Sequence, residues 1–339
     1  MGAIWFDPGQ LANNLHEILG YKAGIAVSIT ELCDLLSGSQ FSDTIQQSEE
    51  GVVRLRSEDY EELYFSVLHK VGHTQVKHNG IVDLFTVSRE IRKVHGEKFA
   101  DELFGIYFTG FERLLKETYK SGVKTLDPTN IILEAYKKLG KKGADTILHL
   151  IETQEKIRQF SPHQNGRWVE WKNIIPLSGI YSRSSNDKSH GEFIDQRLID
   201  FLSNNLNELQ KMHWRKFEEL TAEHFHRKGY KVELGPGQND DGVDLRLWLP
   251  NENEDSRKQL HIVQCKRTKE KVDKIVIKGL YADIQHEGAE IGVLVTTSEL
   301  TPGAKQTIAT RGYPIEEVNG IKVVEWLTKL RTPGTGIVR

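Results

Sequence analysis

The chain has 339 residues, of which 38% are hydrophobic and 27% charged, and its formal net charge is −3. This length predicts two or more domains, the composition is that of an ordinary soluble protein, and the acidic balance argues against a wholly basic nucleic-acid binder. No apolar run approaches the length that spans a bilayer, and the start lacks the features of a secretory signal, so we expect a cytoplasmic protein with no membrane partner. Cys33 and Cys265 are too far apart in sequence to indicate a disulfide framework or a zinc site.

Residues 1–160 are predicted to form a mainly α-helical domain with a recognition or regulatory role. The first helix follows Asp7 and Pro8 and ends near Gly20, Thr30 caps a second, and residues 41–51 read as a polar loop. Longer helices follow from Ser57 onward, and the last is expected to break near Gly140 and Gly143.

Residues 161–193 are predicted to connect the two halves, because prolines, glycines and serines gather there. Trp168, Trp171, Ile174 and Ile175 are expected to dock part of this connector. A helix resumes at Ile194 with apolar residues at helical spacing, and we expect it to brace the halves against each other.

Residues 194–339 are predicted to form an α/β domain with a central mixed β-sheet flanked by helices. Helices are expected over 213–230, 271–288 and 301–312, and strands over 230–234, 243–249, 260–267 and 291–298. The end of the domain, 321–330, is expected to begin as a strand and continue as a helix.

Two neighbouring strands of this sheet carry polar residues suited to metal-dependent hydrolysis. Asp244 lies on the first strand, and Gln264 and Lys266 lie two residues apart on the second, so these two project to one face while Cys265 turns to the other. Cleavage of a phosphodiester by water requires a metal and a nearby cation, and Mg²⁺ needs only one or two carboxylates. Asp244 is therefore the best candidate for the central Mg²⁺ ligand, although a solvent-facing strand also explains so short a pattern.

The order of several blocks makes the pattern more specific. They are FEEL at 217–220, GYKVE at 229–233, NDDGVDL at 239–245, IVQCKR at 262–267 and VLVTTSELTPGA at 293–304. Taken together, residues of about 195–339 resemble the Mrr-type catalytic domain of restriction endonucleases, in the PD-(D/E)xK superfamily. The fold expected is thus a restriction-endonuclease-like domain preceded by a helical region.

The resemblance implies a catalytic set of Glu218, Asp244, Gln264 and Lys266. Asp244 would bind Mg²⁺, with Mn²⁺ as a substitute, and Lys266 would serve the attacking water. Gln264 takes the place of the usual acidic residue, and Glu218 would supply the missing carboxylate, with Glu219 the weaker choice. Cys265 would contribute its carbonyl to the metal. Asp240 and Asp241 offer further carboxylates or simply form the turn.

Residues around this set are candidates for contacts with DNA phosphates. They are Arg267, Lys269, Lys271, Lys274, Thr297 and Ser298. A solvated helix face explains the lysines equally, and capping of the next helix at Thr301 and Pro302 explains the hydroxyls.

The leading hypothesis is therefore a Mg²⁺-dependent endonuclease that cuts DNA in defence against foreign DNA, with the helical region setting its target. Cleavage of both strands favours a homodimer or higher homo-oligomer. Two alternatives stay open: a catalytically silent nucleic-acid-binding or scaffold protein, and an effector nuclease activated when a small signal or a partner protein binds the N-terminal region.

Overall fold

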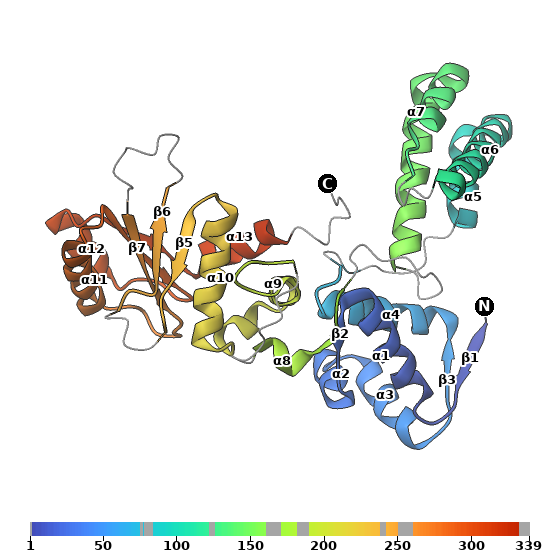
Figure 1. Cartoon of the computed structure of the whole chain (residues 1–339). Coiled ribbons are helices and arrows are strands. Elements are labelled where there is room, and N and C mark those ends of the chain that lie inside the picture. The colour runs from blue at the N-terminus through green and yellow to red at the C-terminus, as the bar shows by residue number, and fades with distance from the viewer. Residues whose placement is uncertain are drawn as a thin grey trace. The chain divides into compact units, whose positions relative to one another are not determined.

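The computed structural model describes residues 2–74, 77, 84–121, 126–160, 171–181, 190–237, 242–249 and 260–331 (Figure 1). The contacts of the chain divide it into two compact units. The first comprises Met1–Gly2, Arg56–Glu62 and Asn79–Arg167, and the second comprises Ala3–Leu55, Leu63–His78 and Trp168–Arg339. The domain bounds expected at residues 160 and 194 stay a prediction. No helix in the described ranges has both the length and the hydrophobicity to cross a bilayer.

The chain begins with short helices and two small pairs of strands. The elements in order are β1 (Ala3–Phe6), α1 (Gln10–Ala23), β2 (Ile25–Ala26), α2 (Ile29–Leu35), α3 (Gln40–Glu50), β3 (Val53–Arg56) and α4 (Ser57–Lys70). β1 pairs with β3, an association that the sequence pattern did not indicate.

The loop expected over residues 41–51 is wrong, because this segment forms α3. The Ser39 side chain caps the helix by accepting the N–H of Phe41, and Phe41 and Ile45 are buried one turn apart. Two apolar residues at the correct spacing and a cap are enough where the neighbouring helices supply the rest of the core.

Three long helices make up most of the first unit. They are α5 (Leu84–His95), α6 (Glu97–Ser121) and α7 (Thr129–Phe160), and their shared core includes Ile91, Leu103, Tyr107, Ile131 and Ile147. The break expected near Gly140 is confirmed, because Gly140 has φ 68° and ψ −165° inside α7. A positive φ of this kind costs glycine little and other residues more.

Part of the expected connector is ordered against the N-terminal helices. β4 (Ile175–Pro176) pairs in parallel with β2, and α8 (Leu177–Tyr181) follows directly. The Trp171 Nε1 donates to the carbonyl of Lys22 at 3.0 Å. Docking through Trp171 and Ile175 is thus confirmed, whereas Trp168 lies outside the described residues.

The C-terminal part contains a five-stranded mixed sheet in the order β5-β6-β7-β8-β9. The strands are β5 (Lys231–Leu234), β6 (Leu245–Trp248), β7 (Leu260–Lys266), β8 (Ile291–Thr296) and β9 (Ile315–Val318). β5, β6 and β7 are antiparallel, and β7, β8 and β9 are parallel, with Leu245 opposite Val263 and Lys266 opposite Thr296. The sheet confirms the predicted α/β fold.

Helices cover both faces of this sheet (Figure 1). α11 (Lys274–Glu287) and α12 (Pro302–Arg311) pack on one face, where Ile277, Leu280 and Ile284 meet Ile262 and Leu294. α10 (Trp214–Arg227) and α13 (Gly320–Leu330) lie on the other.

The last part of the chain differs from its prediction in one respect. The strand expected at the start of residues 321–330 is wrong, because β9 precedes this segment and α13 begins at Gly320. The side chain of Asn319 caps α13 by accepting the N–H of Lys322 at 3.2 Å. The cap decides the conformation of a run whose β-branched residues also suit a strand.

α9 (Gln196–Asn204) and the short η1 (Leu206–Gln210) join the N-terminal helices to the sheet. Arg197 is fully buried and its Nη1 donates to the carbonyls of Gly24 and Asn173, both at 2.8 Å, while its Nη2 pairs with Asp195 at 2.7 Å. These contacts attach the segment to Gly24 and Asn173, whereas its role as a brace between the two predicted halves stays a prediction.

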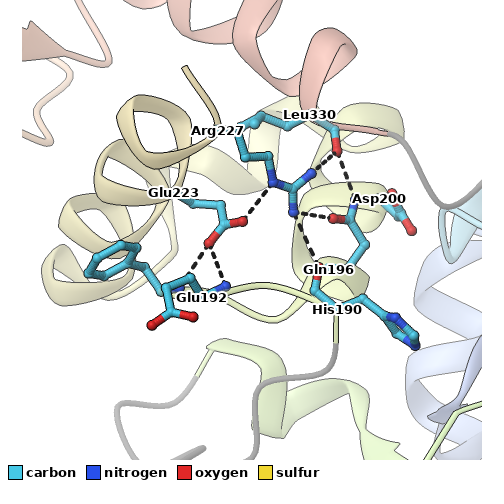
Figure 2. Close-up of polar contacts among 8 residues, drawn as sticks. His190, Glu192, Gln196, Asp200, Glu223, Arg227 and Leu330 are labelled. Carbon is cyan, nitrogen blue, oxygen red and sulfur yellow. Dashed lines mark hydrogen bonds and ion pairs between the residues drawn. The ribbon is translucent and has the colours of Figure 1, made fainter. Parts of the chain in front are cut away.

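A second polar network fixes α10 to α9 and to the end of α13 (Figure 2). Arg227 donates to the carbonyl of Leu330 at 2.8 Å and to Gln196 Oε1 at 2.6 Å, and it pairs with Glu223 at 2.6 Å. The other oxygen of Glu223 accepts the backbone N–H groups of Glu192 and Phe193. Buried polar groups that are bonded on all sides hold one arrangement of the helices.

Candidate active site

α10 carries Glu218 into the domain on its first turns. The ring of His213 caps the helix by accepting the N–H of Arg215 at 3.1 Å. Phe217, Leu220 and Phe225 are buried, and they hold the helix against the sheet. Glu218 is only 5% exposed, which is unusual for a glutamate.

Asp244 directly precedes β6 and is held by the next strand. Its N–H donates to the carbonyl of Val263 at 2.9 Å, and its Oδ2 accepts the N–H of Cys265 at 2.6 Å. A short bond from a backbone N–H to a carboxylate fixes the side chain toward β7. Asp244 is 9% exposed.

The structure brings Glu218 and Asp244 together. Burial, and next to it the negative charge of Asp244, raise the pKa of Glu218 to about 7, whereas the guanidinium of Arg215 opposes that rise. Two buried carboxylates side by side cannot both stay ionised without a cation. Glu219 instead pairs with Lys216 at 2.8 Å, so the side chains of the two neighbouring glutamates have different surroundings.

Gln264 lies on β7, directly after Val263, and is 8% exposed. Its Nε2 donates to the carbonyl of Gly242 at 3.1 Å. Among the described residues no group donates a hydrogen bond to its buried Oε1. An amide oxygen without a donor in a buried position is suited to a cation.

The side chains of Cys265 and Lys266, which follow Gln264, lie in different surroundings. The Cys265 Sγ lies 3.6 Å from the Thr221 hydroxyl, and burial raises the pKa of this thiol well above its usual range, so it stays protonated. A contribution of its carbonyl to a metal stays a prediction. Lys266 is half-buried at the end of β7, and within the described ranges its Nζ has no hydrogen bond or ion pair.

The donor set fits a hard divalent cation. Glu218 and Asp244 provide two carboxylates that meet, whereas a contribution of the Gln264 Oε1 to the same cation stays a prediction. A group of three or more His, Cys, Asp or Glu residues does not occur among the residues that the structure describes. Two carboxylates and an amide suffice for Mg²⁺, which retains several of its waters. Asp240 and Asp241 lie outside the described residues.

The residues expected to contact phosphates have mixed surroundings. Thr297 Oγ1 donates to the carbonyl of Thr268 at 2.9 Å and accepts its N–H at 3.0 Å, so this hydroxyl closes the turn after β7. Arg267 donates to the carbonyl of Gln210, and Lys271 pairs with Glu299 at 2.6 Å. Lys269 and Lys274 are exposed, and Ser298 is half-buried after β8.

Capping explains the hydroxyl at Thr301, which accepts the N–H of Ala304 at 3.2 Å at the start of α12. Pro302 occupies the first turn of that helix. Helix capping, the alternative explanation for the hydroxyls of this segment, is thus confirmed for Thr301. The phosphate contacts of Thr297 and Ser298 stay predictions.

Arg215 is a residue of the site that the sequence did not single out. Its Nη1 donates to Glu218 Oε2 at 2.9 Å, and the two side chains are 17% and 6% exposed. Its spacing of three residues before Glu218 on a helix was the available signal. Helix surfaces carry many such pairs, so the signal becomes informative only after Glu218 is known to be buried.

Comparisons with known proteins agree with this domain. Residues 209–327 match the restriction endonuclease family model Mrr_cat. No curated protein matches the sequence.

Two solved structures are similar to parts of the chain. The DNA modification-dependent restriction endonuclease AspBHI is 21% identical, with a TM-score of 0.32, over 40% of this chain and 37% of that one. MspJI restriction endonuclease in complex with a 27-mer oligonucleotide is 17% identical, with a TM-score of 0.33, over 60% and 42%. The alignments thus span less than half of either structure. The part of the chain that carries the candidate site, residues 209–327, is thus similar to the Mrr_cat restriction endonuclease family.

Proposed function

We propose that the protein is a Mg²⁺-dependent endonuclease that hydrolyses DNA phosphodiester bonds. The observation that carries the proposal is the meeting of Glu218 and Asp244, two buried carboxylates from separate elements, within a restriction endonuclease domain. Buried acids in contact are costly to the fold, and a cation between them offsets that cost.

Each residue has a role in this mechanism. Asp244, Glu218 and the Gln264 Oε1 would hold Mg²⁺, with the carbonyl of Cys265 as a further donor, and Mn²⁺ would substitute for it. When bound, such an ion would lower the pKa of water and neutralise phosphate charge. Lys266, whose ammonium has no partner in the described ranges, would orient the attacking water and balance the charge that develops on phosphate.

The surrounding cations hold the DNA backbone. Arg267, Lys269, Lys271 and Lys274 lie in the turn after β7 and at the start of α11, next to the site in sequence. Thr297 and Ser298 add hydroxyls at the end of β8. Such contacts position the DNA and carry no sequence information. The N-terminal region therefore sets the target.

The biological setting that fits this activity is restriction of foreign DNA in the cytoplasm. One site cuts one strand, so cleavage of a duplex requires a homodimer or a higher homo-oligomer. Activation by a small signal or a partner protein at the N-terminal region is compatible with the contacts of α9, because Arg197 links that region to the domain that carries the site.

Plasmid cleavage tests the proposal. Wild type, Asp244→Ala and Lys266→Ala are incubated with unmodified, methylated and single-stranded DNA and with RNA, in Mg²⁺, Mn²⁺ or EDTA. We expect wild type to cut DNA with either metal and both variants to be inactive.

The remaining outcomes separate the alternatives. A wild type that is inert on every substrate but binds DNA favours the silent scaffold, and cutting by Asp244→Ala shows that the site lies elsewhere. Deletion of residues 1–190 raises activity if that region inhibits the nuclease and lowers activity if it supplies the target.

A further inference from the structure

Arg215 is held at the site by one nitrogen of its guanidinium, the Nη1. The Nη1 is bonded to Glu218 at 2.9 Å, and a Cβ placed on Gly237 would lie 3.0 Å from that nitrogen and 3.2 Å from the ring of Trp214. Gly237 has φ 77°, so the turn after β5 passes closely over the guanidinium. The backbone of this turn, the Trp214 ring and Glu218 therefore confine the side chain.

The other N–H donors of Arg215 have no acceptor among the described residues. A guanidinium carries five N–H groups. The buried Arg197 uses all of its three nitrogens, on Asp195, Gly24 and Asn173. For Arg215 the structure gives a single acceptor among the described residues, so Nε and Nη2 have none there.

The ion pair of Arg215 and Glu218 is largely buried, with side chains 17% and 6% exposed. Burial alone is also compatible with a role in helix stability, because the neighbouring pair of Lys216 and Glu219 is buried as well. The Nε and Nη2 of Arg215 are not among the buried side-chain atoms that lack a partner in the described residues, so these donors reach solvent. A ligand of the site can therefore accept their hydrogen bonds.

The chemistry of the site identifies that ligand as an anion with several oxygens. A guanidinium fork matches a phosphate, to which it donates two parallel hydrogen bonds. Lys271 and Arg267 are already bonded to Glu299 and Gln210, whereas the free donors of Arg215 lie beside the carboxylates that define the reaction centre.

We propose that Arg215 is a substrate-binding residue that donates its free N–H groups to a DNA phosphate at the reaction centre while its bonded arm keeps Glu218 in place. The inference rests on the proposed function and deepens it, because it names Arg215 as the cation that binds the DNA phosphate at the reaction centre. A phosphate brought next to two carboxylates is repelled by them, and a fixed guanidinium offsets that repulsion.

DNA binding without metal tests this assignment separately from cleavage. The affinity of the full chain for a short duplex is measured in EDTA over a series of salt concentrations, for wild type, Arg215→Gln and Arg215→Lys. Loss of one phosphate contact lowers the slope of log affinity against log salt by about one. We expect this change, with weaker binding, in Arg215→Gln and a slope near that of wild type in Arg215→Lys.

Arg246→Gln is the matched control. Arg246 is also a partly buried arginine paired with glutamates, Glu287 on α11 at 2.7 Å and Glu233 on β5 at 3.8 Å. Arg246→Gln should have a lower free energy of unfolding than wild type and should keep the wild-type slope of log affinity against log salt. Circular dichroism checks that all variants are folded.

Two results would overturn the assignment. Arg215→Gln that binds with the affinity and slope of wild type shows that Arg215 acts through Glu218 only, and a wild type that binds no duplex in EDTA shows that no phosphate is received without metal. Failure of the nuclease proposal is distinct, because it is seen as a wild type that cuts nothing in Mg²⁺ or Mn²⁺.

Discussion

Glu218 and Glu219 are adjacent in sequence and differ in every physical respect that bears on catalysis. Glu218 is buried beside Asp244 and its pKa is raised, whereas Glu219 is paired with Lys216. One residue along a helix is a rotation of about 100°, so the two carboxylates leave the helix in different directions. Substitution of Glu218 can therefore be compared with the same substitution of Glu219, which serves as its control.

The first prediction concerns this pair. Glu218→Gln should lower the rate of DNA cleavage by about 100-fold or more, which corresponds to about 3 kcal/mol of transition-state stabilisation. Glu219→Gln should cleave within a few-fold of wild type, because it removes an ion pair outside the site. Single-turnover cleavage in Mg²⁺ gives both rates. Equal loss in the two variants would show that the helix, and not the carboxylate of Glu218, is what matters.

The second prediction concerns pH. Because burial and Asp244 raise the pKa of Glu218 to about 7, this carboxyl is protonated in much of the metal-free protein below that pH. A cation displaces the proton, so the affinity for Mn²⁺ should fall as pH is lowered from 7, by up to about tenfold per unit, and level off above it.

Metal titrations at fixed pH values test this in wild type and in Glu218→Gln. The variant should bind Mn²⁺ weakly, with the steep dependence near pH 7 removed. A wild type whose affinity is constant between pH 6 and 8 would mean that Glu218 does not share the metal.

At the scale of elements, α10 unites the site with the rest of the domain. Its first turns carry Arg215 and Glu218, and its second half carries Glu223 and Arg227. Glu223 binds the segment before α9, and Arg227 binds α9 and the end of α13 (Figure 2). The helix is rigid over this length, so contacts at one end fix the position of the other. Glu218 is placed by tertiary contacts that lie about 7 to 14 Å further along the same helix, at about 1.5 Å per residue.

The third prediction concerns α9. Arg197→Ala should lower the free energy of unfolding by about 3–5 kcal/mol, because Asp195 would remain buried without its guanidinium and the carbonyl of Gly24 would lose its donor. Lys211→Ala, which removes an exposed pair with Glu208, should cost less than about 1 kcal/mol. Urea denaturation measures both, and similar values for the two would contradict a supporting role for Arg197.

At the scale of the whole molecule, hydrogen bonds join the end of α4 to the end of α9 and to the residue that follows α13. Asn204 and Asn205 donate to the carbonyls of His69 and Lys70, both at 2.6 Å, and Arg331 donates to the carbonyl of Gly72. These bonds, together with those of Arg197, belong to the second compact unit.

The fourth prediction follows from these shared bonds. A chain shortened to residues 190–339 should unfold at lower temperature than the full chain, because each buried donor or acceptor left without its partner costs about 1–3 kcal/mol. Replacing residues 79–167 by a short linker should keep the unfolding temperature of this unit, because its internal hydrogen bonds remain. Differential scanning calorimetry compares the three proteins. An unchanged midpoint in the shortened chain would show that the helices add no stability.

Local patterns explain which expectations agree with the structure. The α/β order of the C-terminal part follows from hydrophobic period, glycine stops and caps, and the face shared by Gln264 and Ile262 follows from the two-residue repeat of a strand. The segment over α3 was misjudged because only two apolar residues mark its buried face. Residues 321–330 were misjudged because β-branched residues there suit both states.

By itself the sequence determined the fold class of the C-terminal domain and the residues suited to a metal, because periodicity, caps and residue chemistry are local properties. Only the tertiary structure decided that Glu218 meets Asp244 across 26 positions of the chain, that the Gln264 Oε1 is left without a donor, and that Arg215 joins them. It also decided that part of the connector packs on the N-terminal helices. The physical reason is that burial and the nearness of charges, which set pKa values and open donors, arise only when separate elements pack together.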